Sequence, residues 1–164
     1  MRSTFLIPNK IFTEENLIKQ VFAWKMLGKR IIFTNGVFDV LHKGHIASLS
    51  EAAGHGEILI VAVNADTSVK KLKGDSRPIN DEQARALVLA SLVQTDAVII
   101  FKEATPLELI KKLMPDVLVK GGDYTIEQIA GAKEVIAAGG EVKLAAMVKG
   151  ISSTQIIDKI SVKW

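Results

Sequence analysis

The sequence predicts an α/β fold, a Rossmann-like, doubly wound parallel sheet of five strands in a single domain. Short β-branched runs alternate with helical patterns along the chain, which is typical of βαβ units. The runs are apolar throughout, as expected of parallel strands that are covered on both faces. A length of 164 residues with 48% apolar content suits one packed core, and no repeat, low-complexity segment or linker interrupts it. We expect strands at residues 30–34, 57–63, 96–101, 116–119 and 141–145.

An amphipathic helix is expected ahead of the first strand, at residues 13–27. Its apolar residues Leu17, Val21 and Trp24 recur on one face, and Gly28 follows at the position where glycine commonly ends a helix. We interpret residues 1–28 as an N-terminal helical extension that packs on the edge of the core or at a subunit contact.

Two later helices have start signals to which we give structural weight only. Asn80, with Gln83 three residues on, is expected to cap one helix. Thr105 and Glu108 are expected to form a capping box at the start of another, with a proline at its first helical position.

Composition excludes several classes of chemistry. The chain has no cysteine, so disulfides, thiolate metal sites and a covalent cysteine mechanism are ruled out. No apolar stretch resembles a signal peptide or reaches the roughly 18 to 20 residues that span a bilayer, so we expect a cytoplasmic protein without a membrane partner. The net charge of +3 and the pI of about 9.1 come from scattered basic residues. That pattern favours small anionic ligands over nucleic acid.

The loop after the first predicted strand carries the strongest functional pattern. His42 and His45 stand three residues apart, with Gly44 between them, at the expected start of a helix. Free backbone amides and the helix dipole favour phosphate there, and Gly36 and Gly44 let the backbone approach a ligand. A bound polyphosphate would favour cationic histidines. His55, between two glycines, is interpreted as a solvated turn residue.

These residue types restrict the mechanism. A phosphate monoester that attacks another phosphorus is already ionised near neutral pH, so an in-line displacement needs positioning and charge stabilisation rather than a general base. Histidines, lysines and backbone amides without an evident nucleophile suit that demand. The alternative is structural, with both histidines as ordinary polar residues at a helix start, Phe38 in the core and Asp39 as a turn former.

The sequence GVFD at residues 36–39, followed by HKGH at residues 42–45, resembles the GxFDxxHxGH signature of the cytidylyltransferase-like nucleotidyltransferases. Within them, residues 29–160 look most like the D-glycero-β-D-manno-heptose 1-phosphate adenylyltransferases. The resemblance implies a nucleotidyltransferase domain at residues 29–164 that transfers AMP from ATP, with Mg²⁺, to the sugar 1-phosphate and releases pyrophosphate. It also implies a cytoplasmic homodimer in ADP-heptose and lipopolysaccharide biosynthesis, with the acceptor supplied by a separate sugar kinase.

The resemblance assigns roles to residues in several segments. The implied catalytic residues are His42, His45 and Lys73. The implied nucleotide-binding residues are Asn35, Gly36, Phe38, Asp39, Gly44, Arg85, Lys120, Gly121, Asp123, Ser152, Ser153 and Thr154. The implied sugar-phosphate-binding residues are Asn64, Asp66, Lys71 and Arg77. No protein ligand for a metal is expected.

Each segment also has a structural interpretation. Asp66 can cap a helix, the lysines that follow it can lie on a solvated edge, and Arg85 can be a surface residue. The glycines after Lys120 can form a simple turn. Ser152 and Gln155 can form a capping box, which would itself create an amide-lined anion site.

Alternative functions remain open. Glycerol-3-phosphate cytidylyltransferase and pantetheine-phosphate adenylyltransferase share the histidine motif, although Met147 replaces an arginine of the former, with Lys149 as the nearest candidate cation. A nucleotide-binding module without turnover is the alternative of another class. An aminoacyl-tRNA synthetase is disfavoured by the missing lysine-serine motif and by length, and a dinucleotide-dependent oxidoreductase by the missing G-x-G-x-x-G.

Overall fold

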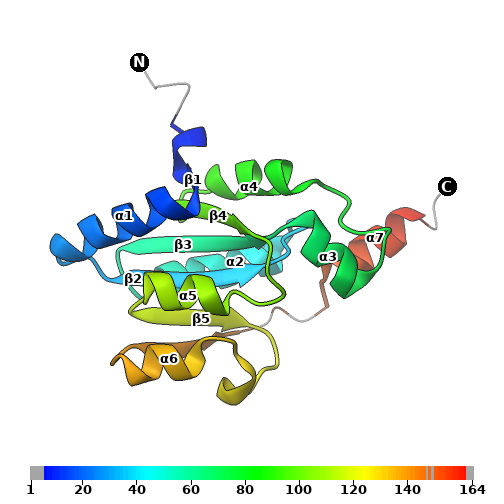
Figure 1. Cartoon of the computed structure of the whole chain (residues 1–164). Helices are drawn as coiled ribbons and strands as arrows, with labels where there is room; N and C mark the ends of the chain where they lie inside the picture. Colours follow the sequence, from blue (N-terminus) through cyan, green and yellow to red (C-terminus); the bar gives the residue numbers. More distant parts are fainter. Residues whose placement is uncertain (1–5, 147, 149, 162–164) are drawn as a thin grey trace.

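Six parallel strands form one sheet in the computed structural model, which describes residues 6–146, 148 and 150–161. Their spatial order is β1-β4-β3-β2-β5-β6 (Figure 1). The strands are β1 (Ile11–Phe12), β2 (Ile31–Gly36), β3 (Ile58–Asn64), β4 (Ala97–Phe101), β5 (Val117–Gly121) and β6 (Glu141–Ala145). The predicted fold class is confirmed, and the five expected strands correspond to β2 to β6. The sequence prediction missed β1 because two residues are too few to carry a periodic signal.

Helices alternate with the strands and cover both faces of the sheet (Figure 1). They are α1 (Glu14–Met26), α2 (Lys43–Ala53), α3 (Asp66–Lys73), α4 (Glu82–Ala90), α5 (Leu107–Leu113), α6 (Ala132–Ala137) and α7 (Ser153–Ser161). Two short 3₁₀ segments are η1 (Pro8–Lys10) and η2 (Ile126–Gln128). Within the described residues, every helix is too short or too polar to traverse a membrane.

The sheet separates two apolar layers because successive strand residues point to opposite faces. Ile31 and Phe33 of β2 belong to the cluster that includes side chains of α1, α5 and α6. Ile32, between them, belongs to the cluster with α2 and α4. All three side chains are fully buried. The two clusters are the physical reason why the strands read as apolar throughout rather than as alternating.

Helix α1 forms as the sequence predicts. The Thr13 side chain accepts a hydrogen bond at the helix start, and Gly28, just beyond the end, has a φ of 70°. Leu17 and Val21 are buried in the same cluster as the central strands, and Trp24 packs against it. The domain division at residue 28 stays a prediction, but α1 packs into one of the two apolar clusters that cover the sheet.

Two predicted helix starts are wrong in detail. The cap of α4 is Asp81, whose side chain accepts from the backbone amide of Ala84 at 2.8 Å, rather than Asn80. Asn80 is engaged elsewhere, because its Nδ2 donates to the backbone oxygen of Asp39 at 2.7 Å. The expected capping box at Thr105 is also absent, since α5 begins one residue later than predicted, with Pro106 as its N-cap and without a side-chain cap.

The strand order reverses between β2 and β5. From β2 the chain passes through β3 to β4 on one side, and then returns to β5 and β6 on the other. In open parallel sheets, ligands bind beyond the carboxyl ends of the strands at such a switch point. Helices α3 and α7 lie beyond this end of the sheet (Figure 1). The loops after β2, β3 and β5 are therefore the segments placed to form a site.

Candidate active site

A cavity of about 580 Å³ opens at the switch point. Its floor includes Asn35, near the end of β2, and Lys120, near the end of β5. The two side chains meet across the switch point, because Lys120 Nζ lies 3.1 Å from Asn35 Oδ1 and 3.3 Å from the Asn35 backbone oxygen. Lys73, at the end of α3, and Ser153, at the start of α7, also line the cavity.

The two histidines of the signature lie at the start of α2, as the sequence predicts. His42 is the N-cap residue, and its Nδ1 accepts a hydrogen bond from the backbone amide of Gly44 at 3.1 Å. A Cβ on Gly44 would lie 3.0 Å from the His42 ring, so a larger residue would displace that ring. The position therefore needs glycine for space rather than for an unusual dihedral angle.

The imidazole rings are stacked beside the cavity. The ring centroids of His42 and His45 are 3.9 Å apart with an interplanar angle of 22°. The ring of Phe38 meets His45 edge-on, with centroids 5.3 Å apart. Phe38 adopts a φ of 51°, an uncommon conformation for a residue with a side chain. His45 lines the cavity, and His42, which does not line it, stacks on His45.

The protein environment favours neutral imidazoles. Burial lowers the pKa of His45 to about 4, helped by the nearby His42 and the positive charge of Lys73. Burial also lowers the pKa of His42. The cationic form expected from the sequence would thus need the added charge of a polyphosphate.

The tautomer of His42 follows from its hydrogen bond. Because His42 Nδ1 accepts from Gly44, the proton of a neutral His42 resides on Nε2. A neutral His42 therefore presents its Nε2–H group as a hydrogen-bond donor. His45 Nδ1 is buried without a hydrogen-bond partner among the described residues.

Asp39 anchors the loop instead of simply forming a turn. Its carboxylate accepts from Arg77 Nε at 2.7 Å and from the backbone amides of Ile79 and Asn80 at 2.8 and 3.0 Å. Burial alone would raise the pKa of Asp39, but the amides of Asn80 and Ile79, together with Arg77, hold it below its usual value. This buried network ties the signature loop to residues 77–80.

Arg85 also binds the signature loop. Its side chain is 1% exposed, and its nitrogens donate to the backbone oxygens of Asn80 at 2.9 Å and Val37 at 2.7 Å and to Asp66 Oδ1 at 2.5 Å. Asp66 follows the N-cap residue of α3 and is not the cap itself. Asp66 and Arg85 do not line the cavity, and the side chain of Arg85 contacts Asp66 and the signature loop instead.

The start of α7 lies at one side of the cavity and contacts the signature loop. The Ser153 hydroxyl donates to the backbone oxygen of Val40 at 3.0 Å, which joins α7 to the signature loop. The Ser152 hydroxyl accepts from the Gln155 amide at 3.2 Å, so the expected cap forms. Thr154 is exposed. The prediction about Met147 and Lys149 falls on positions that lie outside the described residues.

The cavity brings together about half of the predicted site residues. Those that line it are Asn35, Gly36, Phe38, Asp39, His45, Asn64, Lys73, Lys120, Gly121 and Ser153. Those that do not line it are His42, Gly44, Asp66, Lys71, Arg77, Arg85, Asp123, Ser152 and Thr154. Sequence reasoning missed the polar lining residues Thr34, at the end of the first predicted strand, and Ser48, Thr105, Tyr124 and Gln128.

Two signals could have found the missed residues. Ser48 lies one helical turn after His45, on the same face of α2. Thr105 follows β4, and Tyr124 and Gln128 follow β5, whose carboxyl ends lie at the same edge of the sheet as that of β2. Within the described residues, no group of three or more His, Cys, Asp or Glu side chains is placed to hold a metal ion.

Comparison with known proteins shows to which family the chain belongs. Residues 33–159 match the family model described as cytidylyltransferase-like. The chain belongs to this family. That membership confirms the resemblance seen in the histidine-bearing loop.

Among curated relatives of this family member, the "Bifunctional protein HldE" of Koribacter versatilis is 52% identical over 150 residues, which cover 92% of the chain and 31% of the relative. The protein of that name from Azorhizobium caulinodans is 47% identical over 152 residues, 93% of the chain and 32% of the relative. The chain thus spans about a third of the length of the curated relatives it matches.

Solved structures share the fold. A "lipopolysaccharide core biosynthesis protein" from Thermoplasma volcanium is 27% identical with a TM-score of 0.58, over 76% of this chain and 100% of that one. A pantoate-beta-alanine ligase from Francisella tularensis is 16% identical with a TM-score of 0.55, over 89% of this chain and 75% of that one, and supports the fold alone.

Proposed function

We propose that this chain is a nucleotidyltransferase that transfers AMP from ATP to D-glycero-β-D-manno-heptose 1-phosphate and forms ADP-heptose and pyrophosphate. The observation that carries the proposal is the pair of stacked imidazoles at the start of α2, beside the switch-point cavity. The family membership supports nucleotidyl transfer, and the similarity to HldE proteins over 92% of the chain supports the heptose acceptor.

The reaction needs charge stabilisation more than proton transfer. An oxygen of the acceptor phosphate attacks the α-phosphorus of ATP, the bond from that phosphorus to the bridging β-phosphate oxygen breaks, and pyrophosphate leaves. The attacking oxygen is already ionised, so no general base is required. The Nε2–H groups of His42 and His45 would donate to oxygens that gain charge in the transition state. The starts of α2 and α7 would hold the triphosphate with the backbone amides that are not used by the helix caps.

Mg²⁺ belongs to the proposal as the counter-ion of ATP. Within the described residues no side-chain cluster forms a metal cage, so the phosphate oxygens of the nucleotide and water would supply its ligands. Bound there, the ion would neutralise part of the phosphate charge. The residues of the chain would bind and orient the nucleotide beside it.

A substrate panel tests the reaction. Pyrophosphate release is measured with ATP or CTP against heptose 1-phosphate and glycerol 3-phosphate. Turnover restricted to ATP with heptose 1-phosphate is the expected result. Release with CTP and glycerol 3-phosphate would instead identify a cytidylyltransferase, and ATP binding without release on any acceptor would identify a non-catalytic module.

The histidine pair is tested by His45→Ala. We expect kcat to fall by roughly 100- to 1,000-fold, the loss that follows removal of one transition-state donor. His55→Ala is the matched control, because His55 lies outside the cavity, and it should leave kcat unchanged. Equal activity of the two variants would contradict the proposed role of the pair.

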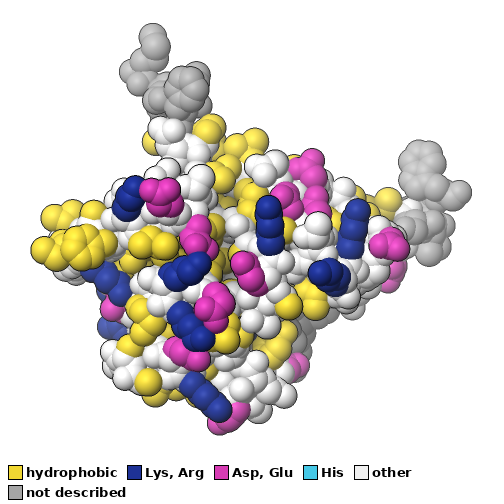
Figure 2. Space-filling view, in the orientation of Figure 1, with side chains coloured by type: hydrophobic (Ala, Val, Ile, Leu, Met, Phe, Trp, Pro, Cys, Tyr) yellow, Lys and Arg dark blue, Asp and Glu magenta, His cyan; other side chains and the backbone are white. Residues whose placement is uncertain are grey.

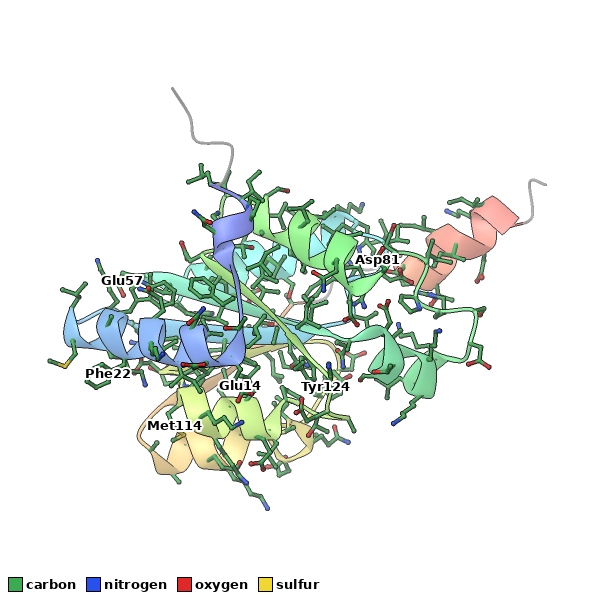
Figure 3. The ribbon with its side chains drawn as sticks, turned by 45° about the horizontal axis from the view of Figure 1, so that its top comes forward. Glu14, Phe22, Glu57, Asp81, Met114 and Tyr124 are labelled. Atoms are coloured by element: carbon green, nitrogen blue, oxygen red, sulfur yellow. The ribbon has the colours of Figure 1, made fainter. Side chains whose placement is uncertain are left out.

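We also propose a cytoplasmic homodimer whose acceptor is supplied by a sugar kinase. Apolar side chains gather on the surface over the end of α1 (Figure 2), where Figure 3 labels Phe22, and they offer a surface for self-association. Phe22, Met26 and Leu27 are exposed by 67%, 72% and 74%. Light scattering should give twice the chain mass for the wild type. A monomeric wild type would contradict the homodimer.

A further inference from the structure

The cavity has a second wall that the proposed reaction does not use. It is formed by the loop between β4 and α5 and by the segment from Gly121 to Ala130, which includes η2. Its polar lining side chains are Thr105, Tyr124 and Gln128, and Lys120 lies beside it. None of the lining side chains between Ala104 and Pro106 or between Tyr124 and Ala130 is charged.

Within the part of the chain that the structure describes, Lys120 is a cation without an acidic partner. Its Nζ contacts the two oxygens of Asn35 and lies 5.6 Å from the ring centroid of Tyr124. Among the described residues no carboxylate forms an ion pair with it, although burial lowers its pKa. A partly buried charge is costly unless it is paired, so a bound anion would stabilise this ammonium group.

The ring of Tyr124 lies close over the backbone at Gly122. A Cβ on Gly122 would lie 2.8 Å from Tyr124 Cε2, and Gly122 has a φ of 123°, so a glycine there lets the ring pack on the backbone. Figure 3 places Tyr124 on the side of the molecule that carries α3, away from Phe22 at the far end of α1. An aromatic ring held beside an ammonium group offers an apolar face next to a charge.

The side chain of Gln128 is hydrogen-bonded through its oxygen, and its Nε2 donor group has no partner among the described residues. Its Oε1 accepts from the Thr125 backbone amide at 2.9 Å, which fixes the side chain at the start of η2. Among the described residues, Nε2 has no hydrogen-bond partner. Because the side chain lines the cavity, this amide and the nearby hydroxyl of Thr105 are available to a ligand. A pre-ordered donor loses little entropy on binding.

We propose that Lys120, Tyr124, Gln128 and Thr105 form the acceptor subsite and determine which phosphorylated polyol is used. Lys120 binds the acceptor phosphate, Gln128 and Thr105 hydrogen-bond its hydroxyl groups, and Tyr124 packs on its carbon face. The inference rests on the proposed function. In the proposed function the triphosphate is bound at the starts of α2 and α7, and in-line attack brings the acceptor from the side opposite the leaving pyrophosphate.

Gln128→Glu tests the subsite with little change of shape. The variant keeps an oxygen for the Thr125 amide, so the cap survives, but it removes the Nε2 donor and adds a negative charge near the acceptor. We expect the KM for heptose 1-phosphate to rise about tenfold or more, while the KM for ATP changes less than twofold. Gln83→Glu, an exposed position of α4 outside the cavity, is the matched control for added charge.

Direct binding separates this inference from the proposed function. Heptose 1-phosphate is titrated calorimetrically into protein saturated with a non-hydrolysable ATP analogue, and Gln128→Glu should weaken its Kd about tenfold. If the wild type binds the sugar phosphate and releases no pyrophosphate, the proposed function fails while the subsite stands. If turnover occurs but Gln128→Glu leaves the acceptor KM unchanged, or raises the KM for ATP instead, the subsite assignment is overturned.

Discussion

The buried carboxylate of Asp39 makes a sharp test of how the signature loop is held. In Asp39→Asn the side chain keeps its shape and one oxygen, which can still accept from the amides of Ile79 and Asn80. Its new NH₂ group would face Arg77 Nε, so two donors would meet where an ion pair stands now. The positive charge of Arg77 would remain buried without its partner.

The magnitude follows from burial. The Asp39 side chain is 1% exposed and that of Arg77 is 10% exposed, so water cannot replace the lost carboxylate. Breaking a buried ion pair by removing one partner costs about 3–5 kcal/mol. For a chain of this size that loss lowers Tm by about 6–20 °C.

Calorimetry and urea unfolding measure the effect, and pH gives a second signature. The folded-state pKa of Asp39 lies below its ordinary value, so the carboxylate contributes its full stability above the unfolded pKa and loses it as pH falls through the folded value. The difference between wild type and Asp39→Asn should therefore be constant near neutral pH and shrink as the pH falls below about 4.

An exposed ion pair provides the control. Glu15 and Lys19 of α1 are paired, but their side chains are 78% and 69% exposed, so Glu15→Gln should change the unfolding free energy by no more than about 0.5 kcal/mol. Equal and small changes in Asp39→Asn and Glu15→Gln would refute the reasoning, because burial would then have no effect on the value of the pair.

The remaining predictions concern the same loop. Gly44→Ala should place a Cβ 3.0 Å from the His42 ring and lower kcat by roughly ten- to 100-fold in the pyrophosphate assay, and an unchanged kcat would contradict the packing argument. In a histidine NMR titration of the nucleotide-free protein, His45 should titrate near its pKa of about 4, and an ATP analogue should raise that value; a midpoint near 6.5 without nucleotide would contradict the burial effect. Arg85→Lys should lose the fork of donors to Asp66 and the loop and cost about 3–5 kcal/mol in urea unfolding, whereas a change below about 1 kcal/mol would show that lysine replaces it.

The central strands and α1 were predictable because their signals are local. The apolar runs of β2 to β6 and the capped, amphipathic pattern of α1 lie within a few consecutive residues each. The prediction of a helix start was wrong where a long-range hydrogen bond competed with a local one. Asn80 is a good cap by type, but its side chain bonds to Asp39, 41 residues away, and Asp81 takes its place.

The site residues also divide into those that local sequence signals predict and those that depend on long-range contacts. The signature loop and the start of α7 could be placed at the cavity because glycines and capping residues mark a helix start in the sequence. Arg85 could not be placed, since an arginine that binds phosphate and one that binds backbone oxygens look identical without their partners. The second wall was missed because Tyr124 belongs to no functional motif, Gln128 signals only a helix cap, and both residues reach the cavity only through the order of the strands.

Strand β2 lies in the middle of the sheet, hydrogen-bonded to β3 along its whole length and to β5 on its other side. Amide hydrogens in such doubly paired strands exchange with solvent only in the rarest openings of a protein. The two-residue β1 at the sheet margin can detach while β2 stays closed. The loop that bears His42 and His45 thus follows the strand that is expected to open least often. Local unfolding of β1 at the edge of the sheet therefore leaves the two imidazole rings in place.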